Sequence, residues 1–203
     1  MMARLVSTRY SLLWVLLVVA AAGLLWPQVR TSEQPGVILG PAQRATSTRV
    51  SGQADVAGVT VRAVRDIATV PEMEQSLFDL VNADRHRNGL AGLAFDPDLL
   101  GVARERAEEQ VDGFPLSHYD AAGELAFANM LDAEGVGYWL AGENLARAQG
   151  PRPPSPERIE AALMASPTHR RNILEPSFDY VAIAAVTDEA GLIAIAQIFI
   201  ASE

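Results

Sequence analysis

Two stretches in the middle of the chain have apolar residues every three or four positions, which is the spacing of one face of an α-helix. Residues 72–88 predict the first helix, which Gly89 ends. Its buried face consists of Met73, Leu77, Leu80 and Val81. The second helix has Asp96 as its N-cap and Pro97 as its first residue. Its buried face consists of Leu99, Leu100, Ala103, Ala107 and Val111.

Two shorter helices are expected further along. The third spans about residues 121–134 and is ended by Gly135. The fourth opens at Ser155, followed by a proline at the first helical position. Between these two helices, residues 142–144 read Gly-Glu-Asn, and glycine and asparagine favour turns. A turn is therefore expected at 142–144.

The end of the chain has the pattern of buried strands. Residues 180–187 and 192–200 are apolar on both faces, and residues 188–191 between them predict a hairpin turn. A sheet with two apolar faces has to be covered on both sides. About four helices around a small antiparallel sheet indicate a layered domain of the α+β class.

The N-terminal part predicts a membrane-directed segment. Residues 10–29 carry no charge, and a helix of this length, at about 1.5 Å per residue, spans roughly 30 Å, the thickness of a bilayer core. The arginines within residues 1–9 favour a cytoplasmic N-terminus. The small residues 20–22 offer an alternative, a signal peptide cleaved there. The apolar run continues past them, which favours an uncleaved transmembrane anchor, and in both cases the rest of the chain lies outside the cytoplasm.

A flexible linker is expected between this segment and the domain. Residues 30–70 are rich in glycine, proline, serine and threonine and show no sustained periodicity. Only residues 59–64 alternate enough for a short strand. The folded domain is expected to begin at Pro71 and to span residues 71–203.

Composition excludes several classes of function. Asp and Glu number 25 against 16 basic residues, giving a net charge of −9, and such an acidic chain is repelled by the phosphates of nucleic acids. All the basic residues are arginines, so lysine-based Schiff-base chemistry is absent. The chain has no cysteine, which excludes disulfides, thiolate zinc sites and cysteine nucleophiles.

Three polar motifs stand apart from these apolar patterns: His118 within Ser-His-Tyr, Glu143 within Gly-Glu-Asn, and His169 within Ser-Pro-Thr-His-Arg. Taken singly, each histidine is more often a surface or hydrogen-bonded structural residue than a ligand. In their order and spacing, however, the motifs resemble those of the CAP superfamily, which groups cysteine-rich secretory proteins, venom antigens and plant pathogenesis-related proteins. The resemblance is to the bacterial branch and covers about residues 72–199, including Asn88-Gly89-Leu90 and Asn172-Ile173-Leu174.

The resemblance implies an α-β-α sandwich and a cleft lined by two histidines and two glutamates, where some members bind a divalent metal. His118, Glu143 and His169 match three of the four positions. At the fourth, Ser166 replaces the second glutamate, and Leu163 stands where many eukaryotic members have a tryptophan. The residues implied for a ligand-binding cleft are therefore His118, Glu143, Ser166 and His169.

Two functions are compatible with this set of residues, beside a purely structural domain whose cleft has lost its function. His118, His169 and Glu143 are the candidate ligands of zinc or another divalent cation, with Glu143 also the candidate catalytic base of a peptidase-like hydrolase. The missing second carboxylate weakens both roles and favours binding over catalysis. The leading hypothesis is therefore a protein of the bacterial cell envelope, membrane-anchored or secreted, that binds a lipid, peptide, wall or protein ligand.

The other polar residues have simpler interpretations. Ser166 is three residues from His169 and able to bond to it, but a role as the cap of the turn before Pro167 is favoured. Asn144 and Asn172 are expected to be turn and backbone-capping residues. Other side chains given a surface or minor role are Ser117, His86, Arg170 and Arg171.

Overall fold

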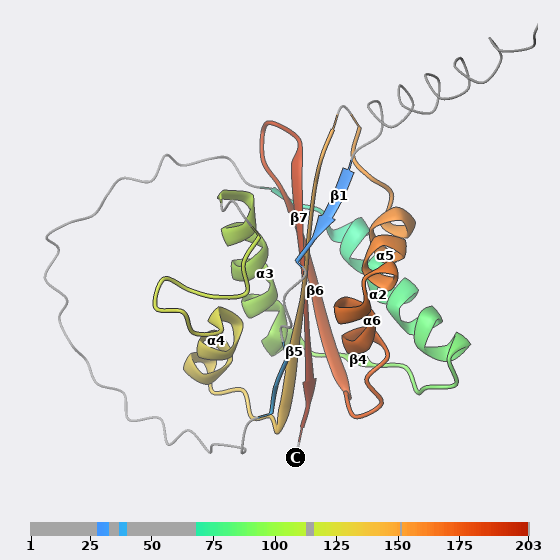
Figure 1. Cartoon of the computed structure of the whole chain (residues 1–203), viewed down its shortest axis with the longest axis vertical. Helices are drawn as coiled ribbons and strands as arrows, with labels where there is room; N and C mark the ends of the chain where they lie inside the picture. Colours follow the sequence, from blue (N-terminus) through green and yellow to red (C-terminus); the bar gives the residue numbers. More distant parts are fainter. Residues whose placement is uncertain (1–27, 33–36, 40–67, 113–115, 151, 203) are drawn as a thin grey trace, which may run out of the picture.

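Helices, sheet and helices form three layers in the computed structural model, which describes residues 28–32, 37–39, 68–112, 116–150 and 152–202 (Figure 1). The helices of this described part are α2 (Pro71–Arg87), α3 (Pro97–Asp112), α4 (Ala126–Glu134), α5 (Pro156–Ala165) and α6 (Pro167–Ile173). The strands are β1 (Gln28–Thr31), β2 (Val37–Leu39), β3 (Ala68–Thr69), β4 (Ala94–Phe95), β5 (Leu140–Gln149), β6 (Tyr180–Thr187) and β7 (Leu192–Ala201). In Figure 1, α3 and α4 cover one face of the sheet, and α2, α5 and α6 cover the other.

The sheet is built around three long strands in the order β5-β7-β6. β1 and β2 both pair with the outer edge of β5, while β3 and β4 pair with β6. Among the described strands, every pairing is antiparallel except that of β4 with β6. The expected hairpin is confirmed, because β6 and β7 pair directly and Gly191 has a φ of 75° in the turn between them.

Two hydrophobic cores explain why the strands are apolar on both faces. Successive side chains of a strand point to opposite faces, so alternate residues of β6 and β7 enter different cores. Val181, Ile183 and Ile195 pack with the helices α2 and α5, whereas Ala182 and Ala184 pack with α3 and α4. The expectation that both faces of the sheet are covered is confirmed.

The predicted helix ends are partly confirmed. The side chain of Asp96 accepts a hydrogen bond from the N–H of Asp98 at 2.9 Å, as expected of an N-cap. Gly135 ends α4 with a φ of 71°. However, α4 begins at Ala126 rather than near residue 121. The carboxylate of Asp120 accepts the N–H groups of Ala122 and Glu124, which holds this segment in turns.

The sequence analysis missed one helix of this region. The motif around His169 forms α6, a separate helix of seven residues, so the described part of the chain has five helices instead of about four. Pro167 has no N–H and cannot continue α5, so the chain bends at Ser166 and a new helix starts with this proline at its first position.

The turn expected at residues 142–144 is wrong. Gly142, Glu143 and Asn144 lie within the ten-residue strand β5 and are buried. A Cβ atom on Gly142 would lie 3.0 Å from the ring of Phe178 and 3.4 Å from the amide carbon of Asn172. The glycine is therefore needed for close packing in a strand and not for a turn.

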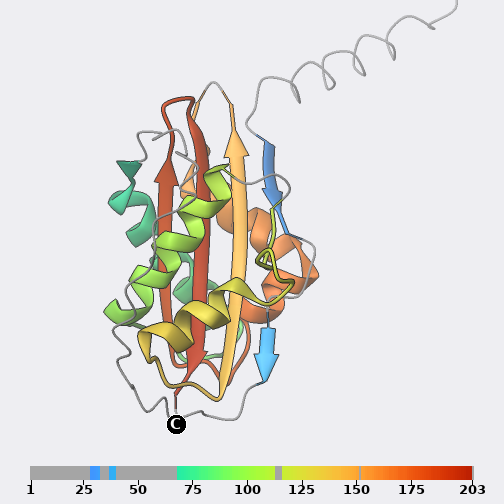
Figure 2. The same cartoon turned by 90° about the vertical axis from the view of Figure 1, so that its left-hand side faces the viewer.

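Part of the expected linker belongs to the sheet. Residues 28–31 pair with residues 146–149 of β5, and residues 37–39 pair with residues 140–142 (Figure 2). β1 also includes the last two residues of the predicted membrane segment, whose residues 10–27 lie outside the described part, as does the strand expected at 59–64. No local pattern predicts β1 and β2, because their pairing partner is more than a hundred residues away.

No helix in the described part of the chain is long and apolar enough to cross a membrane.

Candidate functional site

The first predicted histidine lies in the segment between α3 and α4. The side chain of His118 is fully buried, and its Nδ1 lies 2.5 Å from Oε2 of Glu143 on β5. A carboxylate accepts hydrogen bonds, so Nδ1 of His118 is the nitrogen that carries a proton in this pair. In the neutral ring, Nε2 of His118 is then a hydrogen-bond acceptor.

Glu143 is held by a second partner that the sequence analysis missed. The guanidinium of Arg106, on α3, donates from Nε to Oε1 of Glu143 at 2.7 Å and from Nη2 to its Oε2 at 3.3 Å. Arg106 also contacts the carboxylate of Glu109 and the carbonyl of Ser117, so it links α3 to the segment before His118. Burial opposes the positive charge of Arg106, but the attraction of Glu143 and Glu109 outweighs it, and the pKa of the guanidinium is raised.

The apolar stripe of α3 could have identified Arg106 as a buried residue. It lies three residues after Ala103 and directly before Ala107, both of which are fully buried on α3, and its own side chain is only 2% exposed. An arginine on the apolar stripe of a helix has to find an acidic partner in the interior. The sequence could thus have indicated a buried ion pair, but not that Glu143 is the partner.

The second predicted histidine is presented by α6. Nδ1 of His169 lies 2.9 Å from Oγ of Ser166, which also lies 3.0 Å from Oγ1 of Thr168. Ser166 stands at the N-cap of α6, but its side chain makes no capping hydrogen bond. Ser166 therefore occupies the cap position, but the expected capping by its side chain is wrong. The alternative, a hydrogen bond from this side chain to His169, is confirmed.

Electrostatics keep His169 neutral. Burial lowers the pKa of its imidazole, His118 lowers it further, and Glu143 partly opposes both, so that the pKa falls from 6.5 to about 4. The hydrogen bonds between β5 and α6 run through the amides of Asn144 and Asn172, which bond to the main-chain carbonyls of His169 and Glu143. At neutral pH, His169 is an uncharged imidazole.

The two histidines share one unusual feature. Nε2 of His118 and Nε2 of His169 are both buried and have no hydrogen-bond partner among the described residues. Buried polar atoms are nearly always satisfied, and exceptions point to a ligand, a water molecule or a functional role. The site thus offers two imidazole nitrogens, each held in place through the other nitrogen of its ring.

These residues do not supply the three expected metal ligands in the present arrangement. The described part of the chain contains no group of three or more His, Asp or Glu side chains placed to hold a metal ion. Both oxygens of Glu143 are occupied by Arg106 and His118, so Glu143 acts as the partner that orients a histidine. Only the two Nε2 atoms remain free to coordinate a metal ion. A zinc centre with three protein ligands stays a prediction.

Asn144 and Asn172 do not lie in turns as the sequence suggested, but their side-chain amides do bond to the main chain. Both are buried, and Nδ2 of Asn172 donates to Oδ1 of Asn144 at 2.9 Å and to the carbonyl of Glu143 at 3.1 Å. Nδ2 of Asn144 donates to the carbonyl of His169 at 3.2 Å and to Oε1 of Gln197, on β7, at 2.9 Å. These amides fix the main chain of two site residues relative to each other.

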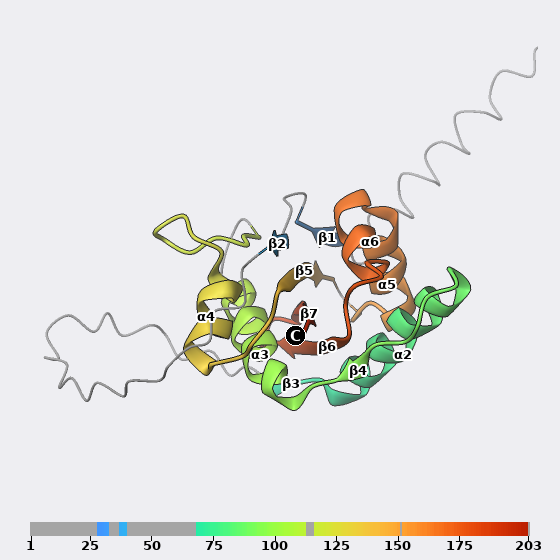
Figure 3. The ribbon, with the colours of Figure 1, turned by 90° about the horizontal axis from the view of Figure 1, so that it is seen from below.

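The site lies beside the edge of β5, and it is closed. Seen from below, β1 and β2 lie along the outside of β5, between the layer of α4 and that of α6 (Figure 3). His118, Glu143 and His169 are at most 1% exposed, and Ser166 is 8% exposed. The structure thus joins His118 to Glu143 and His169 to Ser166, and a ligand has to displace part of the cover of these residues to reach them.

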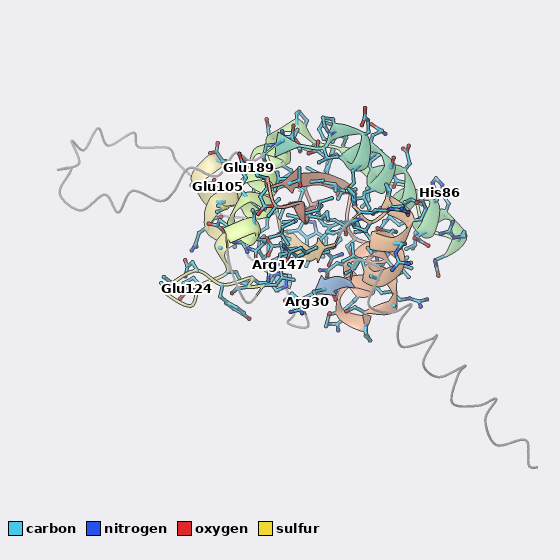
Figure 4. All side chains as sticks on the ribbon, turned by 90° about the horizontal axis from the view of Figure 1, so that it is seen from above. Arg30, His86, Glu105, Glu124, Arg147 and Glu189 are labelled. Carbon is cyan, nitrogen blue, oxygen red and sulfur yellow. The ribbon has the colours of Figure 1, made fainter. Side chains whose placement is uncertain are left out.

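The remaining polar candidates lie outside the site. His86 is exposed near the C-terminal end of α2, as expected for a solvated residue (Figure 4). Arg170 and Arg171 are exposed on α6. Ser117 bonds to the main chain of Tyr119 instead of to His118.

Comparison with known proteins shows to which family the chain is similar. The model of the cysteine-rich secretory protein family, CAP, matches residues 78–199, more than half of the chain. The chain is 31% identical over 149 residues to YkwD of Bacillus subtilis (strain 168), described as an uncharacterized protein. This alignment covers 70% of the chain but 56% of YkwD, so the chain spans little more than half the length of this relative.

Solved structures with a similar fold come from three bacteria. An outer surface protein from Borrelia burgdorferi has a TM-score of 0.58 at 17% identity, covering 69% of this chain and 100% of that one. A cysteine-rich secretory protein from Staphylococcus aureus has a TM-score of 0.52 at 23% identity, covering 65% of this chain and 39% of its own. An extracellular protein with an SCP domain from Bacillus anthracis has a TM-score of 0.50 at 26% identity, covering 64% of this chain and 40% of that one.

Proposed function

Because the chain belongs to the cysteine-rich secretory protein (CAP) family, we propose that it acts outside the cytoplasm, in the bacterial cell envelope, by binding a ligand at His118 and His169. The names of two structural neighbours, an outer surface protein and an extracellular protein, support this location. The predicted membrane-directed segment at residues 10–29 agrees with it. In this proposal that segment connects the domain to the membrane or, if cleaved, directs its secretion.

The observation that carries the proposal is the pair of unsatisfied Nε2 atoms. Both Nε2 atoms are polar and have no partner among the described residues, so the pair suits a ligand with hydrogen-bonding groups such as a hydroxyl or an amide. Wall fragments and peptides carry many such groups, and the head groups of lipids carry fewer. Both imidazoles are oriented in advance by Glu143 and Ser166, which lowers the ordering cost of binding.

The alternative, a metal-assisted hydrolase, has less support. A hydrolase needs a carboxylate or another base that is free to take a proton from water. Glu143 is the only carboxylate hydrogen-bonded to either histidine among the described residues, and its oxygens already accept from Arg106 and His118. With two nitrogen donors and no free base, binding is favoured over hydrolysis.

A titration with zinc separates the two functions. We expect the full chain to bind zinc more weakly than about 10 μM, which corresponds to roughly 7 kcal/mol. Calorimetry is run beside His118→Ala and His169→Ala, with His86→Ala as the control for an exposed histidine. Tighter binding that both site variants abolish and the control keeps would support the metal-assisted alternative.

A second experiment tests binding of organic ligands directly. The ¹⁵N signals of the two imidazoles are recorded while soluble wall fragments, short peptides or phospholipid vesicles are added. We expect at least one of the three probes to shift the Nε2 signals of His118 and His169 together, and His118→Ala to abolish the effect. If no probe shifts either signal, ligand binding at the two histidines is wrong.

A further inference from the structure

Glu160 is a buried acid that lies outside the histidine site. It stands on α5, is 2% exposed, and accepts one hydrogen bond, from Nε2 of Gln197 to its Oε2, at 3.3 Å. Its other oxygen, Oε1, is buried and has no partner among the described residues. A buried carboxylate with an unsatisfied oxygen is costly, so the group requires a cation or a proton.

The neighbour of Glu160 is a second acid. Asp84 on α2 is 9% exposed, and its Oδ1 accepts from Arg87 at 2.5 Å. Two carboxylates cannot bond to each other because both only accept, but one proton between them supplies the missing donor. Burial and the charge of Asp84 raise the pKa of Glu160 to about 8, against the opposing effects of Gln197 and Arg87. Glu160 therefore keeps its proton at neutral pH.

Other elements pack against α5 without changing this result. α6, β1 and β5 all contact α5. Their titratable groups are not among those with the largest effect on the pKa of Glu160: His169, Arg170 and Arg171 on α6, Arg30 on β1, and Glu143 and Arg147 on β5. The state of the acid is thus set mainly by burial and by α2.

A chain of amides connects Glu160 to the histidine site. Gln197 donates to Glu160 and can therefore direct only its carbonyl oxygen, Oε1, towards Asn144. Asn144 donates to that oxygen and also to the main-chain carbonyl of His169. Reversing the amide of Gln197 would place two donors against each other. The acceptor on Glu160 thus sets the orientation of each amide up to His169.

We propose that Glu160 shares one proton with Asp84 and thereby positions the main chain of His169 through the intervening amides. The inference deepens the proposed function, since it concerns the regulation of the same site, but its test needs no ligand. Loss of the proton leaves two buried negative charges side by side, and α5 and the amide chain have to move. The site is then ordered at neutral pH and loosened as the pH rises past about 8.

The first test asks where the proton is. Carboxyl ¹³C signals of the full chain are followed against pH, and the signal of Glu160 is assigned by its absence in Glu160→Gln. We expect a midpoint near 8, and a midpoint lower by about one pH unit or more in Asp84→Asn, which removes the like charge. Glu157→Gln, on the exposed side of the same helix, should leave the midpoint unchanged. A midpoint near the ordinary 4.5 would overturn the proposal.

The second test asks whether the proton controls the site. We expect the main-chain carbonyl signal of His169 to shift with the same midpoint as Glu160 in the wild type. In Glu160→Gln, which mimics the protonated acid, this signal should stay at its neutral-pH position throughout. In Gln197→Leu, Glu160 should still titrate while His169 no longer follows. A His169 signal that ignores the titration in the wild type would show that Glu160 has only a local role.

Stability gives an independent measurement. The pKa of Glu160 is raised from 4.5 to about 8 in the folded protein, so the folded state holds a proton that the unfolded state releases between these values. Its stabilising effect is complete below about 4.5 and is lost as the pH rises through about 8. Between about 4 and 6.5 the lowered pKa of His169 has the opposite effect on stability, so the growth of the unfolding constant, up to about tenfold per pH unit, is expected between 6.5 and about 8. The dependence of the unfolding constant on pH that Glu160 causes should disappear in Glu160→Gln and remain in Glu157→Gln. Equal slopes in all three proteins would contradict the shared proton.

Discussion

Arg106 is the residue on which the geometry of the histidine pair depends most directly. It is 1% exposed and is the cation that faces the buried carboxylate of Glu143, which in turn holds His118. Removing one partner of a buried ion pair leaves the other charge uncompensated, which costs more than the pair itself contributes. The role of Glu143 therefore cannot be separated from that of Arg106.

Replacing Arg106 by methionine tests this dependence. Arg106→Met keeps most of the packing volume and removes the charge, so we expect a loss of about 3–5 kcal/mol in the free energy of unfolding. The control is Arg104→Met, on the same helix, because Arg104 is 31% exposed in its pair with Glu74 and should cost about 1 kcal/mol or less. Urea unfolding measures both. Similar losses in the two variants would mean that the buried pair has no special weight.

At the scale of single elements, β5 combines two requirements that its sequence does not reveal. Its ten residues pair with β7 along their whole length, while β1 and β2 occupy its other edge. Glu143 and Asn144 are neighbours on this strand, so their side chains point to opposite faces, one towards α3 and the other towards α6. One strand thereby supplies contacts to both histidine-bearing segments.

Two glycine-to-alanine substitutions distinguish packing from chain flexibility. Gly142→Ala places a Cβ atom 3.0 Å from Phe178, and we expect it to destabilise the protein by about 1–3 kcal/mol. Gly101 lies within α3 and has nothing within 4 Å of the added atom, so Gly101→Ala should stabilise by about 0.5–1 kcal/mol. Thermal unfolding of the two variants measures whether each substitution lowers or raises the stability. A stabilising Gly142→Ala would contradict the close approach in β5.

At the scale of the whole molecule, the N-terminal strands complete the sheet. A protein that begins at Pro71, where the sequence places the start of the domain, lacks β1, β2 and β3. The edge of β5 would then expose unpaired N–H and C=O groups, which favours association between sheets.

Truncation tests the contribution of these strands. We expect residues 68–203 to unfold at lower denaturant concentration than residues 28–203 and to form dimers or larger species in sedimentation experiments. The control is the comparison of residues 28–203 with the full chain, which should have the same midpoint because both keep β1 and β2. Equal stability of 28–203 and 68–203, with both monomeric, would show that β1 and β2 add little to the domain.

The family, the α+β class and the elements with local patterns could all be predicted from the order of the amino acids. α2, α3 and the β6–β7 hairpin follow from apolar periodicity and from capping or turn residues, all of which act over a few positions. Family resemblance also identified His118, Glu143 and His169, whose spacing along the chain carries no information about their distance in space.

Features that depend on contacts between distant segments became visible only in the folded chain. β5 is polar enough to resemble a turn, and it is a strand because β7 pairs with it. β1 and β2 lie in a stretch with the composition of a linker, and they are strands because β5 has a free edge. Arg106, Gln197 and Glu160 acquire their roles only through partners at least 37 positions away along the chain. Burial makes these partners necessary, and burial is a property of the folded chain rather than of any local pattern.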